Sequence, residues 1–310
     1  MKKTYGSVVV TFNRKDLLME AIQSLLDQTI KPKKIIIVDN ASTDGTISEL
    51  VEKFDVFNQD IFDMVELPEN IGGAGGFKAG LDRCKLYNFD YVSVSDDDAM
   101  YQKDYFEKIL DYAEENPSVR ALCGKVMYED STIQLSHKRR VLHSKSLLDE
   151  KIVSGEEYKR PTFSVDAVSF VGLVIDVSLI SEIGLPLEEY FIWLDDFEYS
   201  LRIRSKTEII CLTDAVIVHK TAFAADNHKY QYTWKEYYGI RNQIDLVKRH
   251  TKHPVVSKLA LEWKFWSRLA ANYVKPKYAS YRSIRSKTLR DAYRDGKNGK
   301  IGKNLKYFPN

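Results

Sequence analysis

Three consecutive aspartates, Asp96, Asp97 and Asp98, follow the apolar run YVSVS. Adjacent carboxylates repel one another unless cations or hydrogen-bond donors compensate their charge. A divalent cation that joins carboxylates to a diphosphate would do this, because such ions bind carboxylate and phosphate oxygens together. A solvated acidic turn that caps the next helix is an equally good interpretation of the triplet on its own.

A second acidic group, Asp195, Asp196 and Glu198, lies in FIWLDDFEYSLR behind Trp193. Acidic residues are common in the first turn of a helix, where they suit the helix dipole. The alternative is a general base, since an alcohol that attacks a sugar carbon must lose its proton to a positioned group.

Two further side chains follow apolar runs. Asp39 ends IIIVD and could accept hydrogen bonds from a base or a ribose hydroxyl, although residues of this type also form ordinary turns. His219 follows AVIV. A histidine at that position is more often a core or surface residue, but it could also be a third metal ligand.

The segment NIGGAGGFKAG, residues 70–80, places four glycines and Lys78 before an expected helix. Glycines let the backbone approach a phosphate or a sugar closely, and a lysine adds a cation. A glycine run alone is weak evidence for such a site.

The elements that must position these residues alternate between strand and helix over the first hundred residues. SVVVTF, IIIVDN, MVEL and YVSVS are expected strands, and the segments between them are expected helices, with Ser42 and Thr43 as caps of the helix TISELVEKF. This alternation predicts an α/β fold with a parallel sheet, which binds ligands beyond the carboxyl ends of its strands.

Beyond residue 100 the pattern is mixed. ALCGKVMY and DAVSFVGLVID are expected strands, the polar stretch at residues 129–162 is expected to form a loop over the site, and a helix is expected from LDDFEYSLRIRSK. From about residue 231 the chain is expected to be helical, aromatic and basic.

Composition is that of a globular protein, with 44% apolar and 29% charged residues among 310. Cys84, Cys123 and Cys211 are widely spaced in apolar stretches, which indicates core residues in a reducing compartment. The first apolar run is too short for a secretory signal, and no run approaches the length of a spanning helix. We therefore expect a cytoplasmic protein.

Charge is unevenly distributed, because residues 246–310 hold 17 Lys and Arg against 3 Asp and Glu, whereas the whole chain has a net charge of only +2. Such a tail could bind nucleic acid or an anionic membrane, or could be a solvated face. Its aromatic residues favour a membrane surface, and no nucleic-acid motif is present. The residues on which this expectation rests are Trp263, Phe265, Trp266, Tyr273, Lys275, Lys277, Tyr278, Tyr281, Arg282 and Arg285. The aromatic residues could instead pack on the catalytic domain or on a second subunit.

Taken together and in order, TFNR, VDNASTDGT, the glycine run, DDDA, WLDDFE and the later histidine resemble the family 2 glycosyltransferases of GT-A fold, over about residues 5–250. The resemblance implies a catalytic domain over residues 1–230, with a nucleotide-sugar half to about residue 100 and an acceptor half after it, and a helical region over residues 231–310. It implies Asp196 as the base, with Asp195 beside it, and Mn²⁺ or Mg²⁺ bound by Asp96, Asp98 and His219. The residues it implies for donor binding are Thr11, Phe12, Arg14, Asp39, Asn70, Gly73, Lys78 and Asp97.

The motifs are most similar to those of galactofuranosyltransferases, which have a similar NxGGxGGF stretch and a tryptophan shortly before paired aspartates. This likeness implies UDP-galactofuranose as donor, a glycan or lipid-linked glycan as acceptor and a single inverting displacement. Leu194 separates Trp193 from the aspartates, which weakens the case for acceptor stacking on that ring. The expected location is the inner face of the plasma membrane, as a peripheral protein and possible homo-oligomer.

Three other classes of protein share some of these features. YYGIRN is similar to parts of rhamnosyltransferases, which would use dTDP-rhamnose. A nucleotidyltransferase would carry a basic glycine-rich loop after its first strand, where this chain has TFNRKDLL. A binding module without activity would have no need to keep both a candidate base and the metal aspartates.

Overall fold

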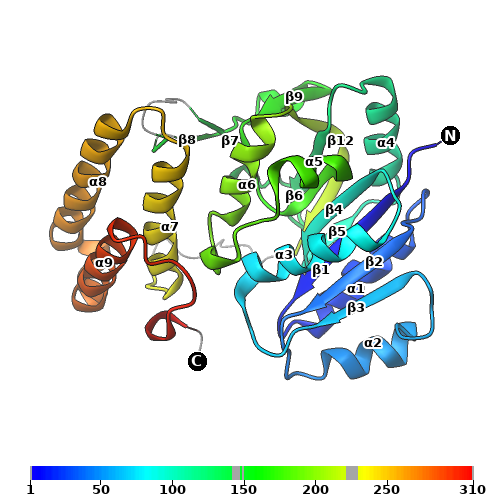
Figure 1. Ribbon diagram of the computed structural model, residues 1–310, viewed down its shortest axis with the longest axis horizontal. Helices are drawn as coiled ribbons and strands as arrows, with labels where there is room; N and C mark the ends of the chain where they lie inside the picture. Colours follow the sequence, from blue (N-terminus) through cyan, green and yellow to red (C-terminus); the bar gives the residue numbers. More distant parts are fainter. Residues whose placement is uncertain (1, 142–146, 149, 221–229, 309–310) are drawn as a thin grey trace.

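The computed structural model describes residues 2–141, 147, 148, 150–220 and 230–308, and its centre is one mixed sheet (Figure 1). The sheet has the strand order β3-β2-β1-β4-β11-β6-β12-β5, and β9 pairs with β12 outside this path. Its strands are β1 (Tyr5–Thr11), β2 (Lys34–Asp39), β3 (Phe62–Glu66), β4 (Tyr91–Asp96), β5 (Ala99–Tyr101), β6 (Ala121–Met127), β9 (Thr162–Val165), β11 (Val171–Asp176) and β12 (Ile209–His219).

The first four strands in the order form the expected parallel part of the sheet, and an antiparallel strand joins them to the rest. β3, β2, β1 and β4 are parallel, but β11 runs antiparallel to both β4 and β6. Apolar runs do not encode strand direction, and an antiparallel neighbour needs no crossover helix. The parallel half still places the carboxyl ends of β1, β2 and β4 at one edge of the sheet, as the sequence predicts.

Helices cover both faces of the sheet. Alternate residues of β1 point to opposite sides, so Val9 joins one core with α1, α2 and α4, and Val8 joins the other with α3, α5 and α6. The helices are α1 (Lys15–Leu26), α2 (Thr46–Phe54), α3 (Gly72–Arg83), α4 (Tyr105–Glu115), α5 (Val177–Ile183) and α6 (Asp195–Arg204). The three cysteines are buried and unpaired.

Two local expectations were wrong. The polar stretch at residues 129–162 is not simply a loop, because β7 (Lys138–Val141) and β8 (Glu150–Ile152) pair there and form a small sheet with β10 (Ala167–Val168). Helix α2 begins after Gly45, whose left-handed φ of 86° favours glycine, and the side chain of Asp44, not that of Ser42 or Thr43, accepts from the Thr46 N–H.

Three C-terminal helices, α7 (Lys235–His250), α8 (Pro254–Val274) and α9 (Arg282–Lys297), pack against one another beside the carboxyl-end edge of the sheet (Figure 1). Aromatic contacts join them, including stacked rings of Phe265 and Tyr293 at 4.1 Å. The helical expectation from residue 231 is confirmed for the part of this region that the structure describes. None of the helices in the described ranges combines the length and the apolar character needed to span a bilayer.

Candidate active site

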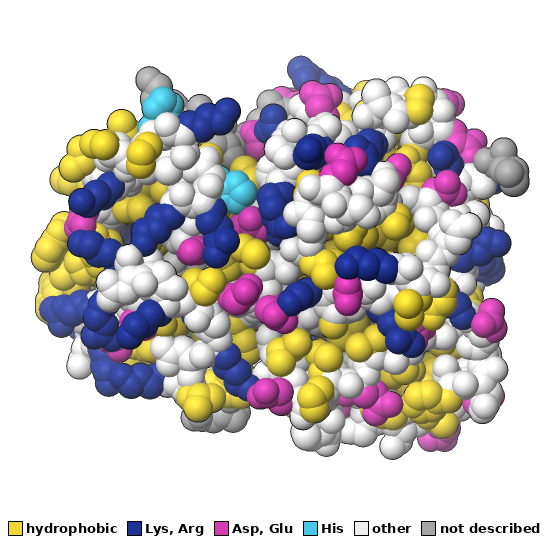
Figure 2. Space-filling model, viewed as in Figure 1, with side chains coloured by type: hydrophobic (Ala, Val, Ile, Leu, Met, Phe, Trp, Pro, Cys, Tyr) yellow, Lys and Arg dark blue, Asp and Glu magenta, His cyan; other side chains and the backbone are white. Residues whose placement is uncertain are grey.

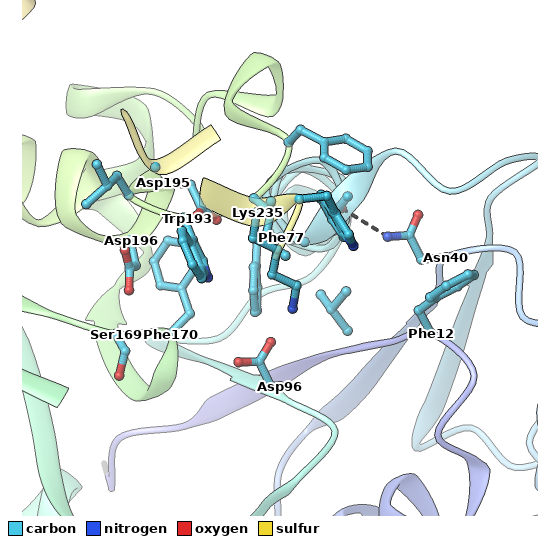
Figure 3. A pocket seen from close by; sticks show the side chains of 18 of the residues that line it. Phe12, Asn40, Phe77, Asp96, Ser169, Phe170, Trp193, Asp195, Asp196 and Lys235 are labelled. Atoms are coloured by element: carbon cyan, nitrogen blue, oxygen red, sulfur yellow. Dashed lines mark hydrogen bonds between the residues drawn. The ribbon is translucent and has the colours of Figure 1, made fainter. Parts of the chain in front are cut away.

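A cavity of about 1050 Å³ opens at the carboxyl ends of β1 and β4, between the sheet and α7 (Figure 3). It gathers twelve of the fourteen residues expected to form the site. These are Thr11, Phe12, Arg14, Asn70, Gly73, Asp96, Asp97, Asp98, Trp193, Asp195, Asp196 and His219.

Two of the expected donor residues do not line this cavity. Asp39 is buried and accepts from the backbone N–H of Ser42, at 3.1 Å to Oδ2, so it holds the turn after β2. Lys78 lies on the outer part of α3, where its Nζ pairs with Glu188 Oε1 at 2.5 Å. A glycine-rich helix start does not specify which way a lysine one and a half turns later will face.

The aspartate triplet is held by the end of β1. Thr11 Oγ1 donates to Asp97 Oδ2 at 2.7 Å, and Arg14 Nη1 donates to Asp98 Oδ2 at 2.7 Å. Burial raises the pKa of Asp97 to about 6, although Thr11 and Arg14 oppose this rise. Burial also favours the neutral form of Asp98, but His219 and Arg14 outweigh it and hold its pKa below the usual range. Asp98 is therefore the member of the triplet whose negative charge is available to bind a cation.

His219 ends β12 with its Nε2 2.9 Å from Asp98 Oδ1, a buried oxygen that receives no well-aligned hydrogen bond from any described residue. Its other nitrogen, Nδ1, lies 2.9 Å from Gln134 Oε1. An amide oxygen accepts only, so Nδ1–H donates to Gln134, and this hydrogen bond orients the ring with its Nε2 towards Asp98. Gln134 comes from the stretch expected to be a loop, and no motif identified it.

The described residues contain no group of three or more His, Cys, Asp or Glu side chains placed to hold a metal ion. Asp98 and His219 nevertheless offer a buried carboxylate oxygen and an imidazole nitrogen to one point. Divalent ions that act on nucleotides commonly take one or two protein ligands and complete their shell with phosphate and water. The donor chemistry of this pair therefore fits such an ion, whereas Asp96 does not join the pair.

Asp96 instead faces Lys235, the first residue of α7, across the cavity (Figure 3). Burial and the charges of Asp98, Asp97 and Asp195 raise the pKa of Asp96 well above its usual value. Burial, followed by the charge of Arg14, lowers the pKa of Lys235. The sequence gives no signal for Lys235, because only tertiary packing places the start of α7 opposite the end of β4.

The paired aspartates begin α6 directly after a strained turn. Phe191, Trp193 and Leu194 have positive φ values of 64°, 65° and 69°, a region that non-glycine residues rarely occupy. Such strain persists only where the surrounding structure enforces it, and it clusters at functional sites. The turn leaves the Trp193 side chain 42% exposed in the cavity, with the aspartates directly behind it.

Two residues of YYGIRN hold this turn in place. Asn242 Nδ2 lies within hydrogen-bond distance of three carbonyl oxygens, those of Tyr190 (2.9 Å), Ile192 (3.1 Å) and Trp193 (2.8 Å). Arg241 is 1% exposed and donates from Nη2 to the carbonyl of Glu189 at 2.9 Å. Helix α7 therefore shapes the segment that carries Trp193.

Within the aspartate pair, burial differs between the two members. Asp195 is buried, and burial followed by the charge of Asp196 raises its pKa to about 8. Asp196 is only partly buried and accepts from the Phe197 N–H at 2.7 Å. At neutral pH Asp195 is therefore mostly protonated, and the partly exposed Asp196 is the member better placed to accept a proton.

The side chain of Asn40 fixes the start of the glycine-rich segment through two hydrogen bonds. Its Nδ2 donates to the Gly72 carbonyl at 3.0 Å, and its Oδ1 accepts from the Ile71 N–H at 2.9 Å. Gly72 has a φ of 80°, and a Cβ atom there would lie 2.0 Å from the Phe191 carbonyl oxygen. Only glycine fits at this contact between α3 and the strained turn, which keeps Asn70 and Gly73 at the cavity wall.

Comparison with known sequences places residues 7–174 in the family described as glycosyl transferase family 2. Galactofuranosyltransferase GlfT1 of Mycobacterium tuberculosis is 27% identical over 71% of each chain. The teichuronic acid biosynthesis glycosyltransferase TuaG of Bacillus subtilis, itself described as putative, is 30% identical over 42% of this chain, and the match spans half the length of TuaG. The dTDP-rhamnosyl transferase RfbG of Shigella flexneri is 29% identical over 33% of this chain and 36% of its own.

Among solved structures, the mannosyltransferase PcManGT of Pyrobaculum calidifontis, in complex with GDP-Man and Mn²⁺, superposes with a TM-score of 0.56. The match covers 97% of this chain and 87% of that chain at 17% identity. At this identity the likeness shows the fold alone, and it confirms the expected GT-A architecture of a curled, mostly parallel sheet with a helical C-terminal region.

Proposed function

The chain belongs to glycosyl transferase family 2, and from this premise we propose that it transfers galactofuranose from UDP-galactofuranose to a glycan or lipid-linked glycan with inversion at the sugar carbon. The observation that carries the proposal is the meeting, in one cavity, of a buried Asp98–His219 pair and a partly exposed Asp196 from a different part of the chain. The choice of donor rests on the similarity to GlfT1, which extends over most of both chains.

In the proposed reaction the acceptor lies beside Trp193, and its hydroxyl oxygen attacks the anomeric carbon of the donor. Asp196 accepts the hydroxyl proton, while Asp195 keeps its own proton and so does not compete at neutral pH. The new carbon–oxygen bond forms as the bond to the diphosphate oxygen breaks, and the nucleoside diphosphate leaves with that electron pair.

Charge on the leaving diphosphate is balanced by groups at the carboxyl ends of β1 and β4. Asp98 and His219 would hold a divalent ion, Mn²⁺ or Mg²⁺, which when bound neutralises phosphate oxygens. Asp96 remains a proposed additional ligand. Arg14 lies against Asp97 and Asp98 at the same edge of the cavity, and its guanidinium would supply further N–H donors to the phosphate oxygens.

The test is a panel of nucleotides and nucleotide sugars measured by thermal unfolding, with and without divalent ions. A ligand at 100 times its dissociation constant adds about 2.7 kcal/mol to the free energy of unfolding. We expect UDP and UDP-galactofuranose to protect most strongly in the presence of Mn²⁺. Transfer of the sugar is then followed by the anomeric configuration of the product.

A second candidate is a rhamnosyltransferase that uses dTDP-rhamnose, which the shorter similarity to RfbG favours. Stronger protection by dTDP than by UDP would replace the galactofuranosyl proposal with this one. Absence of protection by every nucleotide tested would contradict both.

A further inference from the structure

The cavity continues past Trp193 to a wall formed by the C-terminal helices, and two arginines that the proposed chemistry does not use line this wall. They are Arg268 of α8 and Arg285 of α9. Trp193 packs against Gly239, since a Cβ atom on that glycine would lie 2.8 Å from Trp193 Cε3. Gln243, the contact of Arg268, lies one turn further along the same helix. The arginines therefore adjoin the side of the cavity where the acceptor is proposed to lie.

Arg285 is fixed in place and only 7% exposed. Its guanidinium lies over the Tyr278 ring at 4.0 Å, its Nη1 donates to Asn272 Oδ1 at 3.4 Å, and its Nε lies 3.3 Å from Glu236 Oε2. This Nε is buried without a well-aligned hydrogen bond among the described residues. An incompletely paired charge in such a position is costly unless a further group compensates it.

Arg268 adds a second positive charge to the same wall. It is partly buried and donates from Nη2 to Gln243 Oε1 at 3.1 Å, a neutral partner. Burial, followed by the charge of Arg285, lowers the pKa of Arg268. The charged residues that α7, α8 and α9 contribute to the cavity are, within their described parts, Lys235, Glu236, Arg268 and Arg285. Lys235 faces Asp96 and so is set apart from the other three. The rest of the wall therefore holds two arginines and a single carboxylate, that of Glu236.

We propose that Arg268 and Arg285 form a subsite for a phosphate group of the acceptor. A guanidinium presents paired N–H donors that match phosphate oxygens, and a phosphate has enough oxygens and charge to satisfy two such groups at once. This inference rests on the proposed glycosyl transfer, because it assigns the group to the acceptor. Two sources share this chemistry, a lipid diphosphate and a polyol phosphate of a wall polymer.

The experiment measures binding of small phosphates to the full chain after saturation with UDP and Mg²⁺, so that the donor site is occupied. Calorimetric titrations with inorganic phosphate compare the unchanged protein with Arg268→Gln. Lys287→Gln is the matched control, because Lys287 is exposed on α9 and lies outside the cavity. Arg268 is the better position to change, since Arg285 also packs against Tyr278 and could be needed for folding.

We expect Arg268→Gln to weaken phosphate binding at least tenfold and Lys287→Gln to leave it within twofold, with the affinity for UDP unchanged in both. Competition by dimethylallyl diphosphate would assign the group to a lipid diphosphate, and competition by glycerol 3-phosphate would assign it to a polyol phosphate. Equal phosphate affinities in all three proteins, or tighter binding of acetate than of phosphate, would overturn the subsite. Failure of UDP to bind would count against the proposed glycosyl transfer. The phosphate subsite would still be tested in that case, by comparing phosphate affinities of the three proteins without UDP.

Discussion

At the scale of single residues, the two adjacent aspartates at the start of α6 are expected to behave differently. Asp196→Asn keeps the size of the side chain but removes the proton acceptor, so we expect turnover to fall at least about 100-fold while UDP affinity is retained. Asp195 is already protonated at neutral pH, and Asp195→Asn should therefore keep most of the activity. Steady-state kinetics of both variants at pH 7 make the comparison, and the reverse pattern would move the base to Asp195.

The raised pKa of Asp195 also predicts how stability depends on pH. Between its ordinary value of 3.8 and its value of about 8 in the fold, the folded chain holds a proton that the unfolded chain has lost. The contribution of this residue to stability is therefore largest at low pH and decreases as pH rises through that window. Asp195→Asn removes this dependence. The free energy of unfolding of the variant minus that of the unchanged protein should therefore be more positive at pH 8.5 than at pH 5.5.

Urea unfolding at the two pH values, without divalent ions, measures this difference. Asp130→Asn serves as the control, because Asp130 is an exposed aspartate remote from the cavity. An identical pH dependence in Asp195→Asn and in the unchanged protein would show that Asp195 ionises normally.

Metal binding is the third prediction at this scale. Asp98→Ala should abolish transfer and His219→Ala should lose most of the affinity for Mn²⁺ while remaining folded, because both offer their ligand atoms to the same point. Gln134→Ala should weaken Mn²⁺ binding by about 10- to 100-fold through loss of the partner that orients His219. His253→Ala, an exposed histidine, is the control.

Titration with Mn²⁺ in the presence of UDP, together with circular dichroism of each variant, measures both effects. Unfolding of His219→Ala would mean that His219 is a core residue, and full activity after exhaustive chelation would remove the metal from the proposal.

At the scale of elements, the site depends on α7, which holds the strained turn and supplies Lys235. Asn242→Ala removes the side-chain donor of the Ile192 and Trp193 carbonyl groups and one of several donors to the Tyr190 carbonyl, so we expect the free energy of unfolding to fall by about 1 to 3 kcal/mol. The released turn should also move Trp193 and α6, and turnover should decrease more than UDP affinity does. This pattern follows because the donor residues lie on other elements.

Asn116→Ala is the matched control, since its Nδ2 also donates to a backbone carbonyl, that of Tyr112 at 3.0 Å, but away from the cavity. Urea unfolding and steady-state kinetics of both variants make the measurement. Equal losses of turnover in the two variants would show that α7 does not position the turn.

At the scale of the whole molecule, the basic tail divides into two parts. The outer side of α8 exposes large apolar residues, and Figure 2 shows hydrophobic side chains among Lys and Arg over that helix. They include Val255, Leu259, Trp263, Trp266 and Val274. Arg285, by contrast, is buried against the ring of the partly buried Tyr278, so including Arg285 in a membrane-binding surface was wrong. Phe265 likewise stacks on Tyr293.

The revised prediction is that α8 and the lysines after it bind an anionic membrane surface. Each cation near such a surface contributes about 1 kcal/mol, so Lys275→Gln with Lys277→Gln should weaken binding to anionic vesicles roughly 30-fold. Trp263→Ser with Trp266→Ser should also weaken it, because those rings would enter the interface. Binding should decrease as salt rises.

Co-sedimentation with vesicles of anionic and neutral lipid measures this binding, and Lys53→Gln with Lys85→Gln is the control of equal charge on the catalytic side. Equal partitioning onto both kinds of vesicle, or no binding, would contradict the prediction. Concentration-dependent dimerisation that the Trp263 and Trp266 changes abolish would instead assign this face to a second copy of the chain.

The sequence by itself determined the elements and most of the local chemistry. Short apolar runs that end in Asp96 or His219 predicted strands with polar ends, and the order of the motifs predicted the family. These features are local, because a strand end or a helix start depends on a few neighbouring residues. The same reasoning failed for Lys78, since the direction in which a helical side chain faces depends on what packs beside the helix.

Only the tertiary structure decided which distant residues complete the site. Gln134, Lys235 and Arg268 belong to no motif, and Asn242 lies in YYGIRN without any sign in the sequence that it holds the turn before α6. The raised pKa of Asp195 is likewise absent from the sequence, because it comes from burial and from the charge of Asp196, and burial is decided by the fold.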